Sequence, residues 1–226
     1  MDICRNFTEA MRDTAIFDMD GLLLDTEPLW TKSMKTVSER HEIPVKPYQF
    51  KETTGLKIYE VVAYWAVKYP WQGASVQQVS DEVIEDIIAL SKSEGRVMPG
   101  VLPLLRQFRE RGVRMGVATS SPRRMLHELI SYFELEHYFD VLCSADEVGF
   151  GKPHPAVYLH CAERLRSNPL QCIVFEDSFN GMVSGKAARM KVIAVPDPAH
   201  FDDPRFAIAD ERLHSLEEFH YDYMLS

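Results

Sequence analysis

Short apolar runs separated by stretches with helical spacing recur along most of the chain. The apolar runs lie at Thr14–Phe17, Val113–Ala118, Val141–Ser144, Cys172–Phe175 and Val192–Val195. Helical spacing of apolar residues occurs in Val101–Arg111, in Ala156–Leu165, and in the set Leu126, Leu129, Ile130 and Phe133. Strands that alternate with helices in this way predict an α/β fold, in which right-handed crossovers build a doubly wound parallel sheet.

The region between residues 28 and 95 follows a different pattern. Leu29, Met34 and Val37 have a rough helical spacing, and the stretches Ile58–Tyr69 and Val79–Leu90 also carry helical apolar patterns. No strand pattern occurs in this region. We therefore expect an all-helical insert directly after the first strand. Residues 1–27 and 96–226 would then form the core domain, and residues 28–95 a smaller second domain.

The helix that follows the second apolar run carries a start signal. Ser121 is a residue type that caps helices, and Pro122 suits the first helical position. We therefore expect Ser121 to be the N-cap. Farther along, Gly181 and Gly185 lie in another helical stretch, where small residues allow a helix to pack closely on a sheet.

Length and charge narrow the classes of protein. The chain has 226 residues and a formal net charge of -9, which suits one large domain or a core with an insert. An acidic chain without a basic stripe argues against a nucleic-acid partner. Because no apolar run approaches membrane-spanning length and no signal peptide is evident, we expect no membrane association and a cytoplasmic location. The four cysteines form no Cys-x-x-Cys pair and are expected to be reduced thiols. A monomer is the default expectation.

Polar groups follow the apolar runs at equivalent positions. Asp18 and Asp20 come directly after the first run, and Thr119 follows the second. Glu176 and Asp177 follow the run at 172–175. In open α/β sheets, ligands bind in the crevice beyond the carboxyl ends of the strands. Two carboxylates set as close as Asp18 and Asp20 need a cation or a shared proton to coexist there.

Each of these positions also has an ordinary structural explanation. Asp-x-Asp-Gly can be a turn, Thr119 can cap the following helix, and Lys152 can be a solvated loop residue. Glu176 and Asp177 can be an acidic helix start. These explanations do not account for polar groups at the ends of successive apolar strands. The eight histidines show no zinc-ligand spacing, and whether His154 lines the site is left open.

The stretch Phe17–Glu27 resembles the first motif of the haloacid dehalogenase superfamily, in its phosphatase branch. The resemblance extends to Thr119, to Lys152 and to the acidic pair at 176–177, and it implies a Rossmann-like core that transfers phosphoryl groups. It makes Asp18 the nucleophile that forms an aspartyl-phosphate, and Asp20 the general acid and base. It makes Thr119 and Lys152 the residues that bind the phosphoryl oxygens. Ser120, beside Thr119, is a further candidate for substrate binding.

The same resemblance implies a bound Mg²⁺ ion. Its ligands would be the carboxylates of Asp18 and Asp177 and the backbone carbonyl of Asp20, with Glu176 as a candidate helper. Mg²⁺ suits such oxygen donors. A catalytically inactive phosphate-binding protein is the alternative from a different functional class. Such a protein would be expected to lack at least one of these aspartates or Lys152.

The resemblance also gives the insert a role. First-type members of the superfamily carry a helical cap at this place, which closes over a small phosphate ester and supplies specificity. The stretch Thr53–Ile58 resembles the substrate-specificity loop of the family. Lys57 is therefore a candidate for substrate contact, and the alternative is a solvated lysine at the start of a helix. Trp30 and Thr54 are the other candidates.

The insert further resembles that of bacterial phosphatases for 2-deoxyglucose 6-phosphate and hexitol phosphates, in Tyr64–Trp65 and in Tyr69–Gly73. The implied substrate is a phosphorylated sugar or sugar alcohol. A mutase similar to β-phosphoglucomutase is the close alternative. Those mutases carry a histidine where this chain has Trp30, and an arginine where it has Ile58. Both departures favour hydrolysis.

Overall fold

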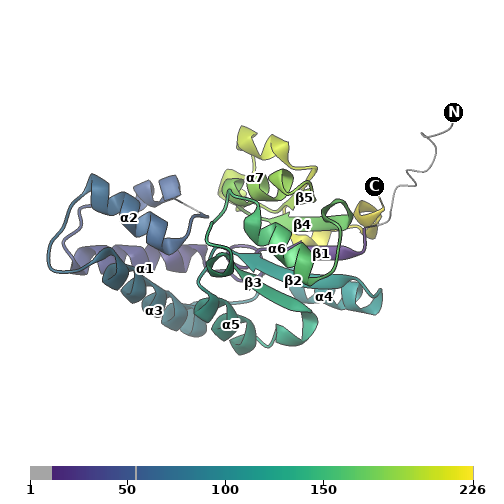
Figure 1. Cartoon of the computed structure of the whole chain (residues 1–226), viewed down its shortest axis with the longest axis horizontal. Helices are drawn as coiled ribbons and strands as arrows, with labels where there is room; N and C mark the ends of the chain where they lie inside the picture. Colours follow the sequence, from purple (N-terminus) through teal and green to yellow (C-terminus); the bar gives the residue numbers. More distant parts are fainter. Residues whose placement is uncertain (1–11, 54, 226) are drawn as a thin grey trace.

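Six strands form one parallel sheet at the centre of the molecule. The computed structural model describes residues 12–53 and 55–225 (Figure 1). The strands are β1 (Thr14–Phe17), β2 (Arg114–Thr119), β3 (Val141–Ser144), β4 (Cys172–Glu176), β5 (Lys191–Ala194) and β6 (Glu211–Arg212). Their spatial order is β3-β2-β1-β4-β5-β6, and all neighbouring pairs are parallel. The predicted doubly wound parallel sheet is confirmed, and only β6 lacked a sequence signal.

The strand order reverses between β1 and β4. The chain builds outward from β1 through β2 and β3, and then returns to the other side of β1 with β4. Such a reversal opens a crevice at the carboxyl ends of the central strands. Phe17 is aligned with Val117 of β2 and with Phe175 of β4, and the Asp18 backbone N donates to Phe175 O at 3.0 Å. The residues that follow β1 and β4 therefore emerge side by side.

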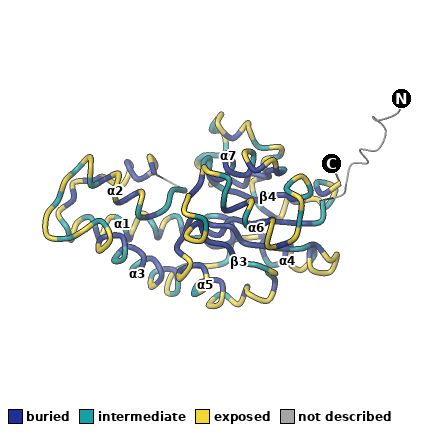
Figure 2. Tube along the Cα trace, in the orientation of Figure 1, coloured by how far each residue is buried: buried dark blue, intermediate teal, exposed yellow. Residues whose placement is uncertain are grey.

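Helices cover both faces of the sheet. They are α4 (Val101–Glu110) and α5 (Arg123–Tyr132) on one face, and α6 (Ala156–Arg164) and α7 (Phe179–Ala187) on the other. Successive strand residues face opposite layers. Phe17 and Phe175 stack with ring centroids 4.8 Å apart in the α4 and α5 layer, whereas Ile16 and Val174 pack in the α6 and α7 layer. Figure 2 shows the buried residues running along the strands.

The insert after β1 is a helical layer beyond the carboxyl ends of the strands (Figure 1). It consists of α1 (Glu27–Arg40), the 3₁₀ helix η1 (Pro47–Thr53), α2 (Ile58–Lys68) and α3 (Val76–Glu94). Its own small core holds Trp65, which packs edge-on against Phe50 and stacks on Tyr69. Residues 28–53 and 55–95 contain no strand, which confirms the predicted helical insert. We call residues 28–95 the cap, which keeps the proposed domain limits.

Short 3₁₀ helices connect the remaining elements. They are η2 (Glu136–Tyr138), η3 (Ala145–Glu147), η4 (Pro169–Gln171), η5 (Pro198–His200), η6 (Pro204–Ile208), η7 (Leu216–Glu218) and η8 (Tyr221–Met224). Cys143, Cys161 and Cys172 are free and buried in the core, whereas Cys4 lies outside the described residues. Among the described residues, no helix combines the length and the apolar character needed to cross a bilayer.

The structure corrects the predicted start of α5. Pro122 has an extended ψ of 145° and lies outside the helix, which begins at Arg123 without a side-chain cap. Ser121 is therefore not the N-cap, and the prediction was wrong. Its Oγ donates to Asp20 Oδ2 at 2.6 Å instead. The local pattern favoured capping, but the Ser121 hydroxyl donates its hydrogen bond to the Asp20 carboxylate, which follows β1.

Candidate active site

Lys152 lies between two carboxylates in the crevice at the carboxyl ends of β1 and β4. Its Nζ is 2.7 Å from Asp18 Oδ1 and 2.6 Å from Glu176 Oε1, and the residue is only 2% exposed. Although burial alone would lower the pKa of Lys152, the carboxylates of Asp18 and Glu176 raise it above its usual value. The ammonium group is therefore a permanent positive charge beside Asp18.

Glu176 has a full set of hydrogen-bond donors. Its Oε1 accepts from Lys152 Nζ and from the hydroxyl of Tyr158. Its Oε2 accepts from the backbone N of Ser178 at 3.2 Å and from Ser178 Oγ at 3.1 Å. Four donors satisfy the lone pairs of one carboxylate. Glu176 is thus arranged to hold Lys152 in place, and its oxygens are already committed.

An oxygen-rich cluster lies beside this ion pair. Carboxylate oxygens of Asp18, Glu176 and Asp177 lie within 4.8 Å of one another. Because both oxygens of Glu176 are engaged, Asp18 and Asp177 are the members best suited to a cation. Gly21 makes room for the cluster, since a Cβ there would lie 2.1 Å from Asp177 Oδ2 and its φ is +74°. Such carboxylate donors fit a hard divalent cation such as Mg²⁺.

The crowding of the carboxylates shifts their titration. Desolvation raises the pKa of Asp18 to about 8, despite the opposing charge of Lys152. Desolvation, followed by the charges of Glu176 and Glu27, raises the pKa of Asp177 well above its usual value. The pKa of Glu27 itself rises to about 7, because of burial and then the charges of Asp20 and Asp197. One lysine does not balance this much negative charge, so the crevice favours an additional cation.

Asp20 is held by three side-chain donors. Thr26 Oγ1 donates to its Oδ1 at 2.7 Å and Trp30 Nε1 donates to the same oxygen at 3.0 Å. Ser121 Oγ lies 2.6 Å from Oδ2. An indole N–H can only donate, whereas a serine hydroxyl can turn and accept. The oxygen that can carry a proton is therefore Oδ2, opposite Ser121.

The last residue of β2 and the residue after it bring two hydroxyl groups to the crevice. Thr119 Oγ1 accepts from the Ser121 backbone N at 3.0 Å, so its hydroxyl proton is directed elsewhere. Ser120 Oγ accepts from the Lys152 backbone N at 3.2 Å, which ties the end of β2 to the loop that carries Lys152. Thr119 and Ser120 are both buried. The structure thus brings the core residues predicted from the sequence together at one edge of the sheet.

Comparisons with known proteins agree with this geometry. The family described as haloacid dehalogenase-like hydrolase matches residues 15–195. The chain belongs to this family. It is an enzyme, a phosphoric monoester hydrolase, and its relatives share most of its length. Hexitol phosphatase B of Escherichia coli (strain K12) is 43% identical over 212 residues, which is 90% of this chain and 92% of that protein.

Two further relatives agree. A phosphorylated carbohydrates phosphatase of Thermotoga maritima is 32% identical over 80% of this chain and 83% of its own length. The crystal structure of CbbY from Rhodobacter sphaeroides in complex with phosphate superposes with a TM-score of 0.83 at 25% identity. That match covers 92% of this chain and 96% of the solved one. The predicted family and fold are confirmed.

The cap of this haloacid dehalogenase-like hydrolase touches the core beside the active site. Trp30 of α1 reaches Asp20, as described above. At the loop before α2, Lys57 Nζ lies 3.3 Å from Asp146 Oδ1 of the core. A Cβ at Gly151 would lie 2.6 Å from Lys57 Cγ, so the lysine stem packs against the Lys152 loop. Lys57 is placed at the boundary between cap and core, but its charge is paired with Asp146 in this conformation.

The cap loop also approaches the residue that fixes Glu176. A Cβ at Gly55 would lie 3.2 Å from Ser178 Oγ, and the φ of Gly55 is +82°. Thr54, the neighbouring candidate for substrate contact, lies outside the described residues. His154 is exposed and stacks on Phe150 at 4.7 Å between ring centroids. Those contacts give His154 no part in the carboxylate cluster.

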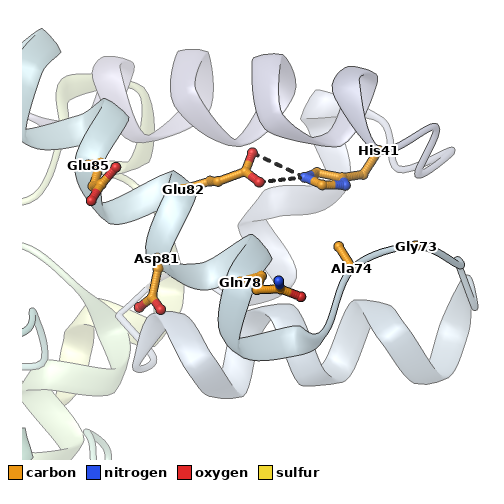
Figure 3. A pocket seen from close by; sticks show the side chains of 7 residues that line it. All are labelled: His41, Gly73, Ala74, Gln78, Asp81, Glu82 and Glu85. Carbon is orange, nitrogen blue, oxygen red and sulfur yellow. Dashed lines mark hydrogen bonds and ion pairs between the residues drawn. The ribbon is translucent and has the colours of Figure 1, made fainter.

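The hollow shown in Figure 3 lies in the cap, away from the active site. It measures about 300 Å³ and lies between the end of α1, α3 and the turn at Gly73. His41 Nε2 is 3.1 Å from both carboxylate oxygens of Glu82, and hydrogen bonds from Arg40 and then His41 hold the pKa of Glu82 below its usual value. These pairs tie α1 to α3, and we assign them a role in cap stability.

Several residues of the site escaped prediction from the sequence. Thr26 and Ser121 hold Asp20, and Tyr158 and Ser178 hold Glu176. Asp146 pairs with Lys57. Thr26 lies within the motif-like stretch Phe17–Glu27 but was given no role, and the others lie in no recognisable chemical motif. For Ser121 and Ser178 the available signal was weak: each lies two residues after a strand end, and local pattern alone cannot separate such a position from an ordinary cap or turn.

Proposed function

We propose that this hydrolase is a Mg²⁺-dependent phosphatase that hydrolyses a small phosphorylated sugar or sugar alcohol through an aspartyl-phosphate. The placement of Asp18 carries the proposal. Its carboxylate lies 2.7 Å from the Lys152 ammonium group, and Asp20, held by three donors, follows two residues later. A nucleophile, a proton carrier and a fixed positive charge thus share one crevice, which is the set that phosphoryl transfer through a carboxylate needs.

The proposed reaction has two halves. In the first, a carboxylate oxygen of Asp18 attacks phosphorus, the bond from phosphorus to the sugar oxygen breaks, and the leaving alkoxide takes a proton from Asp20. In the second, Asp20 takes a proton from water, and the water oxygen attacks phosphorus and displaces Asp18. Inorganic phosphate leaves, and both aspartates return to their starting states. Ser121 can follow the proton by turning its hydroxyl at Asp20 Oδ2.

The metal is part of the proposal. Asp18 and Asp177, with the backbone carbonyl of Asp20, would hold Mg²⁺. When bound, Mg²⁺ offsets the repulsion between the Asp18 carboxylate and the phosphate oxygens. The pKa of Asp18, raised to about 8 by desolvation, supports a cation at this place, because the nucleophile must be ionised near neutral pH.

The remaining phosphoryl oxygens would meet donors from β2 and from the Lys152 loop. Lys152 supplies charge, and the hydroxyl groups of Thr119 and Ser120 supply hydrogen bonds. All three are buried, so these donors act where water does not compete. Each would strengthen its contact as charge develops on the transferring group.

The choice of a sugar or sugar alcohol rests on the relatives and on the cap. The hexitol and carbohydrate phosphatases named above span most of the chain. The core handles the phosphoryl group, which all phosphate esters share, so discrimination must come from groups that meet the carbon skeleton. Trp30 and Lys57 lie where the cap meets the core, and we propose them as residues that contact substrate. Lys57 would leave Asp146 to do so.

A panel of phosphate esters, assayed by phosphate release, tests the proposal. Hexitol 6-phosphates, 2-deoxyglucose 6-phosphate and glucose 1-phosphate should be compared with p-nitrophenyl phosphate. We expect a sugar or sugar-alcohol phosphate to give the highest kcat/KM. EDTA should abolish activity and Mg²⁺ should restore it, whereas Ca²⁺ should inhibit because its looser coordination misplaces the nucleophile.

The panel also separates the alternatives. Full activity in a metal-stripped sample would contradict the proposed metal dependence. Conversion of glucose 1-phosphate to glucose 6-phosphate without phosphate release would identify a mutase. Phosphate binding without turnover of any ester would identify a protein that only binds phosphate. Each result points to a different use of the same crevice.

A further inference from the structure

Tyr158 is the bulkiest of the fully buried side chains among the described residues. It lies on α6, in the layer between that helix and the sheet. Its hydroxyl donates to Glu176 Oε1, the oxygen that also accepts from Lys152 Nζ at 2.6 Å. A phenylalanine would fill the same volume without burying a polar group. Packing alone therefore does not explain why this position carries a hydroxyl group.

Tyr158 contacts both partners of the ion pair between Lys152 and Glu176. Its hydroxyl meets the Glu176 carboxylate, and its ring centroid lies 5.0 Å from Lys152 Nζ. A lysine ammonium group has three donors on a flexible stem, so its direction is set by its surroundings. Here the surroundings are Asp18 Oδ1, Glu176 Oε1 and the aromatic face. Displacing Glu176 would redirect the ammonium group away from Asp18.

The two oxygens of Glu176 are fixed from two directions. Ser178, at the start of α7, holds Oε2 through its backbone N and its Oγ. Tyr158, from α6, holds Oε1. Without the phenol, Oε1 would keep Lys152 as its one hydrogen-bond partner, and the pair could move together. Burial, and then the charges of Glu176 and Asp18, raise the pKa of Tyr158 well above its usual value, so the phenol stays a neutral donor.

We propose that Tyr158 is a positioning residue: it fixes Glu176 so that Lys152 stays directed at Asp18 and at the transferring phosphoryl group. This inference rests on the proposed role of Lys152 in phosphoryl transfer, but not on the identity of the sugar. Because charge on the phosphoryl oxygens and the geometry of attack are most demanding in the transition state, the loss should appear there more than in the binding of phosphate.

The variant Tyr158→Phe removes one oxygen and keeps the ring. Tyr138→Phe is the matched control, because Tyr138 is also buried, at 8% exposed, and its hydroxyl lies 3.3 Å from Arg106 Nε, outside the site. Both should be assayed with p-nitrophenyl phosphate and Mg²⁺, so that a wrong assignment of the sugar leaves the test intact. We expect kcat/KM of Tyr158→Phe to fall on the order of tenfold, which corresponds to the loss of about one hydrogen bond to a charged group. Tyr138→Phe should match the wild type.

Two inhibitors separate positioning from a structural role. Orthovanadate resembles five-coordinate phosphorus, and inorganic phosphate resembles the product. In Tyr158→Phe, the inhibition constant of orthovanadate should rise in proportion to the loss of kcat/KM, whereas that of phosphate should change less than about twofold. A purely structural role would lower the melting midpoint and leave the ratio of the two constants unchanged. Wild-type kcat/KM and a wild-type ratio would overturn the proposal, whatever the melting midpoint.

A double-mutant cycle tests whether Tyr158 acts through Glu176. In the Glu176→Gln background, Tyr158→Phe should reduce kcat/KM by less than about twofold, because the carboxylate it positions is already lost. A further tenfold loss in that background would show that the two residues act independently and would overturn the proposal.

Discussion

The core crevice and the cap hold their charged groups in opposite ways. In the crevice, Asp18 and Lys152 are 7% and 2% exposed, and their partners lie on strand ends or on helices packed against the sheet. Besides the Trp30 hydrogen bond to Asp20, three ion pairs of long side chains join cap and core: Lys57 with Asp146, Lys92 with Glu128, and Arg124 with Glu85. The last two pairs are solvent-exposed. Breaking a buried pair is costly, whereas an exposed pair contributes about 0–1 kcal/mol.

The difference suits the two tasks of the enzyme. Phosphoryl transfer needs groups held within a fraction of an ångström. In the crevice, Glu176 accepts from four donors and Asp20 from three. The proposed role of the cap requires it to move away from the core when substrate enters, and exposed ion pairs, which are weak and salt-sensitive, would oppose that movement little. Changes in the crevice should therefore cost far more activity than changes at the boundary of the cap. Except at Asp20, whose effect depends on the leaving group, they should affect all substrates alike.

Replacing the proposed nucleophile should give the largest effect. Asp18→Asn keeps the shape of the side chain but removes the charge that we propose attacks phosphorus. Turnover of every phosphate ester should fall by about 10⁴-fold or more, as for other catalytic side chains that act as a unit. Phosphate release from a sugar phosphate and from p-nitrophenyl phosphate measures it. A residual rate near that of the wild type on either ester would remove Asp18 from the chemistry.

Asp20→Asn should separate substrates by their leaving groups. Proton transfer contributes roughly 10²–10⁴-fold, and a sugar alkoxide needs the proton more than a nitrophenolate does. The loss in kcat/KM should therefore be large for a sugar phosphate and clearly smaller for p-nitrophenyl phosphate. Equal losses on both esters would contradict the role of Asp20 as an acid.

Lys57→Ala tests the cap side of the comparison. If Lys57 reaches a substrate hydroxyl group, its loss should reduce transition-state stabilisation for sugar phosphates by about 1–3 kcal/mol, measured as a lower kcat/KM. The kcat/KM for p-nitrophenyl phosphate should be little affected. Lys92→Ala is the matched control, because Lys92 forms a cap-to-core ion pair with Glu128 at 2.8 Å.

The variant Asp146→Ala then distinguishes two roles of Lys57: contacting the substrate, or holding the cap closed through its ion pair with Asp146. It removes the partner of Lys57 and leaves the lysine free to meet substrate. A loss as large as that of Lys57→Ala, on all esters, would mean that the ion pair serves to hold the cap closed. An unchanged sugar-phosphate rate in Lys57→Ala would remove Lys57 from substrate recognition.

The smallest expected effect is a dependence of thermal stability on pH and metal. The pKa of Asp18 is raised from its ordinary value of 3.8 to about 8, so between these values the folded chain binds more protons than the unfolded chain. Its stability without metal should fall as pH rises through this window. Mg²⁺ should therefore raise Tm more at a pH near 8 than near 6.

The expected difference is a few degrees, since about 1 kcal/mol corresponds to roughly 2–4 °C for a chain of this size. Differential scanning fluorimetry with EDTA or Mg²⁺ measures it. Asp18→Asn should flatten the pH dependence. A Mg²⁺ effect that is equal at both pH values in the wild type would contradict the proposed burial of ionised carboxylates around the metal.

The sequence predicted the sheet and the residues of the crevice because parallel strands end at one edge. Asp18, Thr119 and Asp177 each follow an apolar run, so their convergence needs no knowledge of the loops. Ser121 was misassigned for the same reason that Tyr158 was missed. Their partners, Asp20 and Glu176, lie 101 and 18 residues away in the chain, and no local pattern reports a hydrogen bond over such a separation.

The sequence predicted the helices of the cap but not the side-chain contacts between the cap and the core. Apolar spacing fixes which face of α3 is buried, yet it says nothing about which long side chain crosses to the core. The pairing of Lys57 with Asp146 depends on how the cap lies on the core, which is a property of the whole molecule. The close approach of Gly55 to Ser178 also depends on how the cap lies on the core.

Borohydride trapping tests the central claim most directly. Borohydride reduces an acyl phosphate to an alcohol, so an aspartyl-phosphate trapped during turnover becomes homoserine at the attacked position. Peptide mass spectrometry of the wild type, quenched with borohydride while it hydrolyses a hexitol phosphate, should find homoserine at Asp18, dependent on substrate and on Mg²⁺, with Asp20 unmodified. Sustained turnover without homoserine at Asp18, or with homoserine at another carboxylate, would contradict the account.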